Sequence, residues 1–260
     1  MNKINLFELF NKKYPNRCPI SHDNRIWLEK SFSLLLDIFD KEKIRHSKIL
    51  IPGHSNFPIK YNGNTQTAFD TLKIVAGQME VEFDEIQLNL YDEGVNAIST
   101  GSPWGRSIFL HSDISGKGSA GLYWGKQADN KYHIGLERRK LTQPENMVAT
   151  LAHELAHIKL LGKSKIKTND EKLTDLTTVI FGIGIFNANA AFQIIKSGDS
   201  IGWRKIGYLT QMEWGYALSL LAYIREEKKP NWIEYLTLNV KEEFKQGERF
   251  IENNKDLILA

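Results

Sequence analysis

The sequence predicts an α+β fold, in which a small mixed or antiparallel sheet is followed by a helical C-terminal half. Apolar residues recur every three or four positions before residue 80 and again from Thr142 onward, which is typical of amphipathic helices. Between these parts, the apolar period changes to two, as expected for strands with one buried face. Because the predicted strands are grouped and do not alternate with helices, a parallel βαβ fold is not expected.

Each part of this fold corresponds to definite segments. The spacing predicts two helices early in the chain, at Ser21–Arg45 and Thr65–Met79. Alternating residues predict strands at Val81–Phe83 and Ile86–Leu90, and a hairpin over Gly121–Leu136 with Asp129 and Asn130 near its turn. The stripe of apolar and aromatic residues from Trp203 to Tyr223 follows helical spacing and predicts a core helix.

The chain is expected to form one folding unit over residues 1–260, because no internal repeat or low-complexity linker divides it. Within this unit, we expect an N-terminal helical extension over residues 1–64. An α/β part should follow over residues 65–162, and a helical part over residues 163–260.

The composition is that of an ordinary folded chain. With 260 residues, 42% of them hydrophobic and 25% charged, disorder, collagen and coiled coil are excluded. The 34 Lys and Arg residues nearly balance the 31 Asp and Glu residues, which leaves a net charge of +3. We therefore expect neither a nucleic-acid partner nor a membrane partner, and the composition does not determine an oligomeric state.

Two further observations predict a cytoplasmic location. Cys18 is the only cysteine and cannot form an internal disulfide, and Glu8 interrupts the apolar stretch nearest the N-terminus. Residues Leu176–Ile195 carry no charge, but their Thr, Asn and Gln side chains favour a helix buried in a globular protein over a membrane span.

The motif with the clearest chemistry is His153-Glu154-Leu155-Ala156-His157. Thr142, Pro144 and Glu145 predict the start of its helix through a capping box, and Gly162 marks the expected end. Two histidines four residues apart on a helix lie about 40° apart around its axis and one turn along it. Both imidazoles can therefore bind a single cation, and Glu154 is placed to contact a water on that cation. This is the arrangement of a metal-dependent hydrolase.

A catalytic zinc site needs three protein ligands and an open position for water. The next helix offers Glu171 and Asp175, which are four residues apart and therefore lie on one face. One carboxylate can bind the metal while the other accepts the second ring N–H of a ligand histidine. Asp175 also lies among apolar residues, where an unpaired carboxylate would be costly, so it is expected to have a partner.

Together, His153-Glu154-Leu155-Ala156-His157 and Glu171-Lys172-Leu173-Thr174-Asp175 resemble the zincin metallopeptidases. The resemblance covers residues 142–181 and is to the gluzincin branch, typified by thermolysin, whose second helix carries Glu-x-x-x-Asp. Residues 173–189 are also similar to a group of bacterial HExxH proteins of unassigned function.

The resemblance implies a zincin-like fold with Zn²⁺ as cofactor and a peptide or protein as substrate. His153, His157 and Glu171 would be the zinc ligands. Glu154 would be the general base, and Asp175 would accept a hydrogen bond from a ligand imidazole. The gap between His157 and Glu171 is shorter than in thermolysin, which leaves Asp175 as the alternative third ligand.

The zincin resemblance also implies a strand that aligns an extended substrate beside the active-site helix. The hairpin Gly121–Leu136 is expected to provide it, so Tyr123 and His133 are candidate substrate contacts. Tyr208 and Tyr216 are candidate hydrogen-bond donors to a developing oxyanion, although both also fit the apolar stripe of a core helix.

These observations favour a zinc-dependent metallopeptidase. The alternative is a non-catalytic protein in which the metal stabilises a zincin scaffold used as a binding module. A fourth protein ligand, such as Asp175 together with Glu171, would favour this alternative, because structural zinc sites are closed. Hydrolysis of a bond other than a peptide bond is not separated from the first hypothesis by the sequence.

Overall fold

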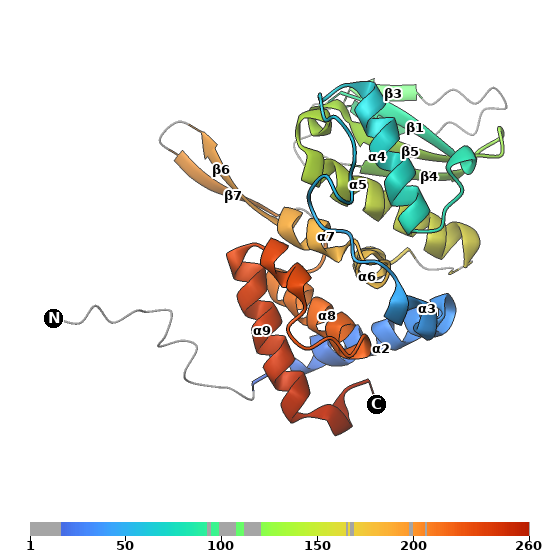
Figure 1. The fold of residues 1–260 in the computed structure, drawn as a ribbon. Coiled ribbons are helices and arrows are strands. Elements are labelled where there is room, and N and C mark those ends of the chain that lie inside the picture. The colour runs from blue at the N-terminus through green and yellow to red at the C-terminus, as the bar shows by residue number, and fades with distance from the viewer. Residues whose placement is uncertain are drawn as a thin grey trace. The chain divides into compact units, whose positions relative to one another are not determined.

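A computed structural model describes residues 17–92, 95–98, 108–111, 121–164, 166, 169–197, 200–205 and 207–259. Along the chain, which Figure 1 colours from blue to red, helices come before and after a series of strands, and a further hairpin precedes the last helices. The predicted α+β class is therefore confirmed. The small sheet is mixed, and most of the described residues outside it are helical.

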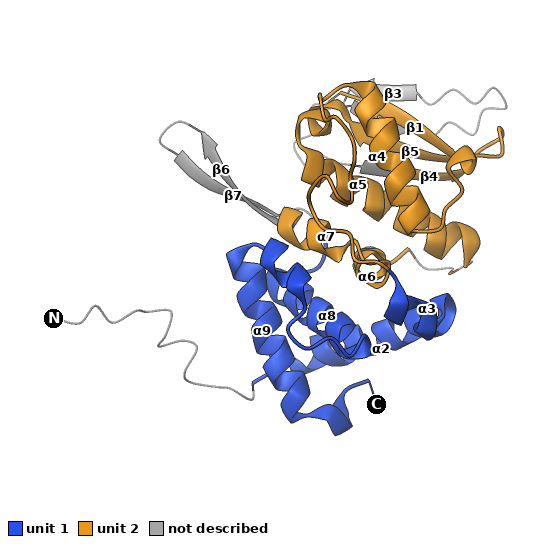
Figure 2. Ribbon diagram, viewed as in Figure 1, with its two compact units in different colours: residues 1–47, 191–260 blue, residues 48–190 orange. Residues whose placement is uncertain are grey.

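The chain divides into two compact units, which Figure 2 shows in different colours. Unit 1 comprises residues 1–47 and 191–260, and unit 2 comprises residues 48–190. The N-terminal helices therefore belong with the C-terminal helices, and these boundaries do not coincide with those predicted at residues 64 and 162. Residues 1–16 of the predicted extension lie outside the described part, and the expectation of a single folding unit stays a prediction.

Unit 2 contains a three-stranded sheet in the order β1-β5-β4. Strand β1 (Ile86–Tyr91) runs parallel to β5 (Tyr132–Glu137), and β4 (Gly121–Lys126) runs antiparallel to β5. Strands β4 and β5 form the predicted hairpin. A separate antiparallel pair is formed by β2 (Val95–Ile98) and β3 (Ile108–His111).

Helix α5 (Pro144–His157) is the centre of unit 2. It packs against β4, β5 and α4 (Thr65–Gln78), and against two helices that follow it, α6 (Glu171–Ile180) and α7 (Gly184–Ala190). Between Met147 and Leu160 every residue is buried except His153, which is partly exposed. A helix enclosed on almost all sides holds its side chains in fixed positions, which a metal site requires.

Unit 1 is mainly helical. Helices α2 (His22–Phe39) and α3 (Lys41–His46) precede a hairpin of β6 (Phe192–Ser197) and β7 (Ser200–Lys205), which is followed by α8 (Gln211–Ile224) and α9 (Leu238–Asn253). Within α2, the buried Glu29 forms an ion pair of 3.0 Å with Arg25. Glu29 also accepts a hydrogen bond of 2.6 Å from the hydroxyl of Tyr216 on α8.

Two predicted helices are interrupted, and in each case a residue with positive φ explains the break. Asp40 has a φ of 66° and divides the predicted helix Ser21–Arg45, because its side chain accepts from the backbone N–H groups of Glu42 and Lys43 and so starts α3. Gly182 has a φ of 73° and separates α6 from α7 within Leu176–Ile195, whose last residues belong to β6.

The prediction of one continuous buried helix over Leu176–Ile195 was therefore wrong, although α6 and α7 are largely buried. No helix in the described part of the chain is both long enough and apolar enough to cross a lipid bilayer. The hairpin β6–β7 is an addition to the C-terminal half, which was expected to be almost all helical.

The predicted N-cap of the motif helix, Thr142, is one residue before the observed N-cap, Gln143. The hydroxyl of Thr142 donates to the carbonyl of Arg139 and closes a 3₁₀ turn, Arg138–Thr142, so it does not cap the helix. Helix α5 begins at Pro144, whose fixed φ suits a first helical position. At the other end, the chain continues past Gly162 as a π-helical turn, Ile158–Lys163. Residues Val81–Phe83, predicted as a strand, lead into a 3₁₀ turn at Phe83–Glu85.

Helices α8 and α9 approach closely at two glycines. A Cβ atom on Gly215 would collide with the side chain and backbone of Glu243, and a Cβ atom on Gly247 would collide with the side chain of Ser219. At Gly215 the nearest atoms include backbone atoms of α9, which cannot rotate away. The packing of unit 1 therefore requires glycine at this position.

We predict that Gly215→Ala lowers the free energy of unfolding by about 1–3 kcal/mol, because overpacking forces the two helices apart. Gly77→Ala on α4 is the matched control, since a Cβ atom there meets nothing within 4 Å. The control should raise stability by up to about 1 kcal/mol through helix propensity. Urea unfolding followed by circular dichroism measures both. Equal stability of Gly215→Ala and the unmutated protein would contradict the close contact between α8 and α9 at Gly215.

Candidate metal centre

Helix α5 presents both motif histidines to the same region. His153 and His157 are separated by one helical turn, and their rings meet edge to face, with centroids 4.9 Å apart and planes at 87°. The side chain of His153 is 17% exposed and that of His157 is 6% exposed. The two imidazoles therefore converge at a partly open position beside an otherwise buried helix.

Glu171, the first residue of α6, faces both imidazoles. The carboxylate of Asp170 caps α6 by accepting from the backbone N–H groups of Lys172 and Leu173, which fixes where the helix starts. Atom Oε2 of Glu171 then lies 3.2 Å from Nε2 of His153 and 3.3 Å from Nε2 of His157. One carboxylate oxygen thus lies against the same nitrogen of each ring.

These distances match those between the ligands of a tetrahedral metal ion. Metal bonds of roughly 2.0–2.1 Å at tetrahedral angles place neighbouring ligand atoms about 3.3 Å apart. The ligand atoms of His153, His157 and Glu171 all lie within 4.8 Å of one another. This group, which we call the His/His/Glu cluster, could therefore hold a metal ion without a large rearrangement.

Asp175 lies on the other side of the His153 ring. Its Oδ1 atom is 2.9 Å from Nδ1 of His153, and the residue is only 1% exposed. The buried carboxylate thus has the partner that the sequence predicts for it. A carboxylate on Nδ1 orients the ring and leaves Nε2 facing the His/His/Glu cluster.

The cluster is strongly coupled electrostatically. Burial lowers the pKa of His153, but hydrogen bonds to Asp175 and Glu171 outweigh burial and raise this pKa to about 10. Hydrogen bonds from His153 and His157 hold the pKa of Glu171 far below its usual range. In the metal-free protein, a cationic imidazole and the carboxylates attract one another, which keeps the ligand side chains together.

Glu154 is buried next to the cluster. It is 3% exposed, and its Oε2 atom has no hydrogen-bond partner within the described residues. Burial raises the pKa of Glu154, and the charge of Glu171 raises it further, whereas His153 and His157 lower it. An unpaired buried carboxylate oxygen is costly in a structural role, but it suits a group that accepts a proton from water.

Strand β4 brings Tyr123 onto the cluster. The ring of Tyr123 stacks on that of His157, with centroids 5.4 Å apart and planes at 13°. Tyr123 lies where the pairing of β4 with β5 shifts register, and such irregularities redirect side chains. Nearby, the ring of Tyr132 packs on the backbone of Gly162, where a Cβ atom would lie 2.6 Å from Cε1 of that ring. The aromatic contacts thus fasten the hairpin to the end of the motif helix.

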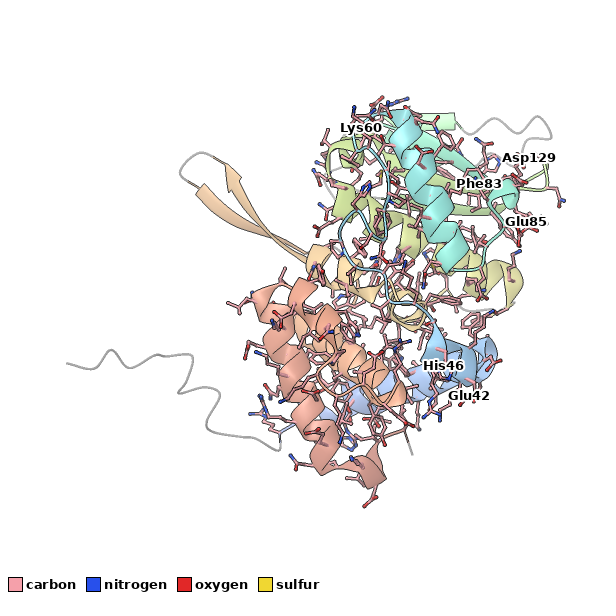
Figure 3. All side chains as sticks on the ribbon, in the orientation of Figure 1. Glu42, His46, Lys60, Phe83, Glu85 and Asp129 are labelled. Carbon is pink, nitrogen blue, oxygen red and sulfur yellow. The ribbon has the colours of Figure 1, made fainter. Side chains whose placement is uncertain are left out.

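The other sequence candidates lie elsewhere. His133 alternates along β5 with the buried Tyr132 and Ile134, so it lies on the opposite face of the sheet from Tyr123. Its Nε2 atom is 2.8 Å from Oδ2 of Asp129, which Figure 3 labels near the hairpin turn. The substrate contact suggested for His133 would therefore be on the other face of the sheet, and it stays a prediction.

The oxyanion role suggested for Tyr216 requires a correction. It is fully buried in unit 1, and its hydroxyl donates to Glu29, so this hydroxyl already has a structural partner. Tyr208 belongs to the same unit, precedes α8 and is 49% exposed. Tyr208 and Met212 therefore depart from the predicted core stripe, and the oxyanion role suggested for Tyr208 stays a prediction.

Sequence reasoning missed one residue that contacts the His/His/Glu cluster. Thr174 lies three residues after Glu171 on α6, and its Oγ1 atom is 3.4 Å from Nδ1 of His157. A helical residue at this spacing shares the face of Glu171, so the sequence did carry a signal for it. Threonine in a helix usually bonds only to its own backbone, which is why the signal was weak.

Comparison with protein-family models, curated proteins and solved structures gives no significant match. The resemblance to the zincin metallopeptidases therefore rests on the motif residues alone and stays a prediction.

We predict that the chelator-treated protein binds one divalent ion per chain, as measured by titration with Zn²⁺ and elemental analysis. His157→Ala and Glu171→Ala should each weaken this binding strongly, because each removes one donor atom. His46→Ala is the matched control, since His46 is exposed on α3 and faces Glu42, as labelled in Figure 3. Much less than one ion per unmutated chain would contradict the assignment, as would equal losses in the control.

Proposed function

We propose that the protein is a zinc-dependent metallopeptidase in which Glu154 activates water. One observation carries the proposal: a carboxylate oxygen of Glu171 lies 3.2 and 3.3 Å from the Nε2 atoms of two histidines, beside a buried glutamate whose Oε2 atom has no hydrogen-bond partner among the described residues. This arrangement agrees with the motif resemblance to the zincins. The likeness in fold and the activity are part of the proposal.

The donor set supports zinc. Two imidazole nitrogens and one carboxylate oxygen are ligands that zinc accepts in catalytic sites. Within the described residues the cluster contains three side chains, which is the number that leaves a coordination position for water. Asp175 faces Nδ1 of His153 instead of joining Nε2, so Glu171 is the third ligand in this proposal.

The number of ligand side chains also bears on the alternative hypothesis, a non-catalytic binding module. A binding module with a structural metal would be expected to have a closed site, with a fourth protein ligand. Asp175 was the candidate for that fourth ligand, and its place on the far ring nitrogen of His153 favours the catalytic hypothesis.

The chemistry follows from the positions of the side chains. When bound, a zinc ion would lower the pKa of a water molecule towards 7 and polarise the scissile carbonyl. Glu154 accepts the proton of the attacking water at Oε2 and transfers it to the leaving amine. Asp175 holds the Nδ1 proton of His153, so that Nε2 of this ring keeps its lone pair for the ligand position.

The sheet supports a peptide as the substrate. Strand β4 is at the edge of the order β1-β5-β4, and its outer edge has no partner strand in the described part of the chain. An extended peptide can pair with such an edge through backbone hydrogen bonds. Because the Tyr123 ring on β4 stacks on His157, a peptide on this edge would pass the His/His/Glu cluster. This favours a peptide bond over other bonds that zinc enzymes hydrolyse.

We predict that Glu154→Gln retains zinc but lowers the rate of peptide cleavage by about 10²-fold or more, because the amide cannot accept the water proton. Cleavage of fluorescein-labelled casein and of a mixed peptide library, at full zinc occupancy, measures the rate. Glu145→Gln, which lies in the exposed first turn of the same helix, is the matched control. Equal rates in Glu154→Gln and the unmutated protein would exclude Glu154 as the base. Absence of cleavage by the zinc-loaded unmutated protein would contradict peptidase activity.

A pair of substitutions separates two roles of Tyr123. Tyr123→Phe keeps the ring that stacks on His157 but removes the hydroxyl, so we expect unchanged zinc affinity and a turnover lowered by roughly tenfold or more if that hydroxyl donates to the oxyanion. Tyr123→Leu removes the ring as well and should also weaken zinc binding. Unchanged turnover in Tyr123→Phe would limit Tyr123 to packing.

A further inference from the structure

The two metal-facing histidines are supported in different ways. His153 directs its Nδ1 atom to the carboxylate of Asp175 at 2.9 Å, whereas His157 directs its Nδ1 atom to the hydroxyl of Thr174 at 3.4 Å. Thr174 is 1% exposed and His157 is 5% exposed, so bulk water does not compete for this contact. One ring therefore has an anionic partner and the other has a neutral one.

The direction of the Thr174 hydroxyl determines what it can offer to His157. Atom Oγ1 lies 3.0 Å from the backbone carbonyl of Asp170, which has no proton to give, so the hydroxyl donates its proton there. Only the lone pairs of Oγ1 remain for the imidazole, and His157 must then carry a proton on Nδ1. When a metal takes the place of the contact between Nε2 and Oε2 of Glu171, this tautomer provides the Nε2 lone pair as the ligand.

The two aromatic contacts of His157 restrain its ring but do not choose its tautomer. Tyr123 stacks on one face of the ring, and the ring of His153 meets it at 87°. Neither contact is a hydrogen bond to a ring nitrogen. The hydroxyl of Thr174 is thus the contact at Nδ1 that distinguishes the tautomer able to bind metal from the one that is not.

We infer that Thr174 is the positioning residue of His157: it accepts the Nδ1 proton and holds Nε2 as a metal ligand, in the way that Asp175 does for His153. This inference rests on the proposed metal site and extends it to a residue with no known ligand role in the motif. A threonine hydroxyl serves here because its own proton is taken by the first turn of α6.

The neighbouring Thr177 provides a matched comparison. Its hydroxyl donates to the carbonyl of Leu173 four residues earlier, as the Thr174 hydroxyl does to Asp170, and Thr177 is fully buried on the same helix. Among the described residues, the hydroxyl of Thr177 has no hydrogen bond to a histidine. Thr174→Val and Thr177→Val therefore each remove an equivalent hydrogen bond within α6. Only Thr174→Val also removes the acceptor at His157.

The experiment measures zinc affinity in the full-length chain by competition with a chelator for Thr174→Val, Thr174→Ser and Thr177→Val. The absorption spectrum of bound Co²⁺ reports the ligand geometry, and urea unfolding of the metal-free variants checks that each one folds. We expect Thr174→Val to bind zinc about tenfold more weakly, the usual lower limit for loss of such a support, and to alter the Co²⁺ spectrum. Thr174→Ser and Thr177→Val should stay within about twofold of the unmutated protein.

Any other outcome would contradict the role of Thr174, the proposed function, or both. Unchanged affinity in Thr174→Val, while the unmutated protein binds zinc, overturns the role of Thr174 and leaves the proposed function standing. An equal loss in Thr177→Val assigns the effect to helix stability and also overturns that role, as does failure of Thr174→Ser to restore affinity. Absence of zinc binding by the unmutated protein overturns both the inference and the proposed function.

Discussion

The convergence of two imidazoles from α5 on one carboxylate from α6 is the interaction on which the site depends. Atom Oε2 of Glu171 lies 3.2 and 3.3 Å from two ring nitrogens, and this requires the start of α6 to face the end of α5. Burial of α5 on almost every side and the capping of α6 by Asp170 set that relation. Attraction between a protonated His153 and the carboxylates then holds the ligands together before any cation arrives.

The contacts at the Nδ1 atoms of the two histidines determine which ring nitrogens face the metal position. Asp175 and Thr174 each contact an Nδ1 atom, so the Nε2 atoms of His153 and His157 face the cluster. Glu154 differs from these groups because its Oε2 atom has no hydrogen-bond partner within the described residues. Satisfied nitrogens beside an unsatisfied carboxylate are expected where one group must remain free to move a proton. Strand β4 then brings to the same place a backbone edge that has no partner strand among the described residues.

The sequence predicted the parts of this arrangement that depend on local periodicity. The His153 and His157 helix, the hairpin, and the shared face of Glu171 and Asp175 follow from spacings of two, three and four residues. It did not determine which acid faces Nε2, because that depends on how α6 packs on α5. It also missed the interruptions at Asp40 and Gly182 and the pairing of N-terminal with C-terminal helices in unit 1, since these depend on positive φ angles and long-range contacts.

The most direct test of the central claim is X-ray absorption spectroscopy at the zinc edge of the metal-loaded protein. We expect four-coordinate zinc with two imidazole nitrogens at about 2.0–2.1 Å and oxygen ligands completing the shell. Loss of one imidazole in His157→Ala would assign the signal to this cluster. A shell without imidazole, or with the same two imidazoles in His157→Ala, would contradict the account.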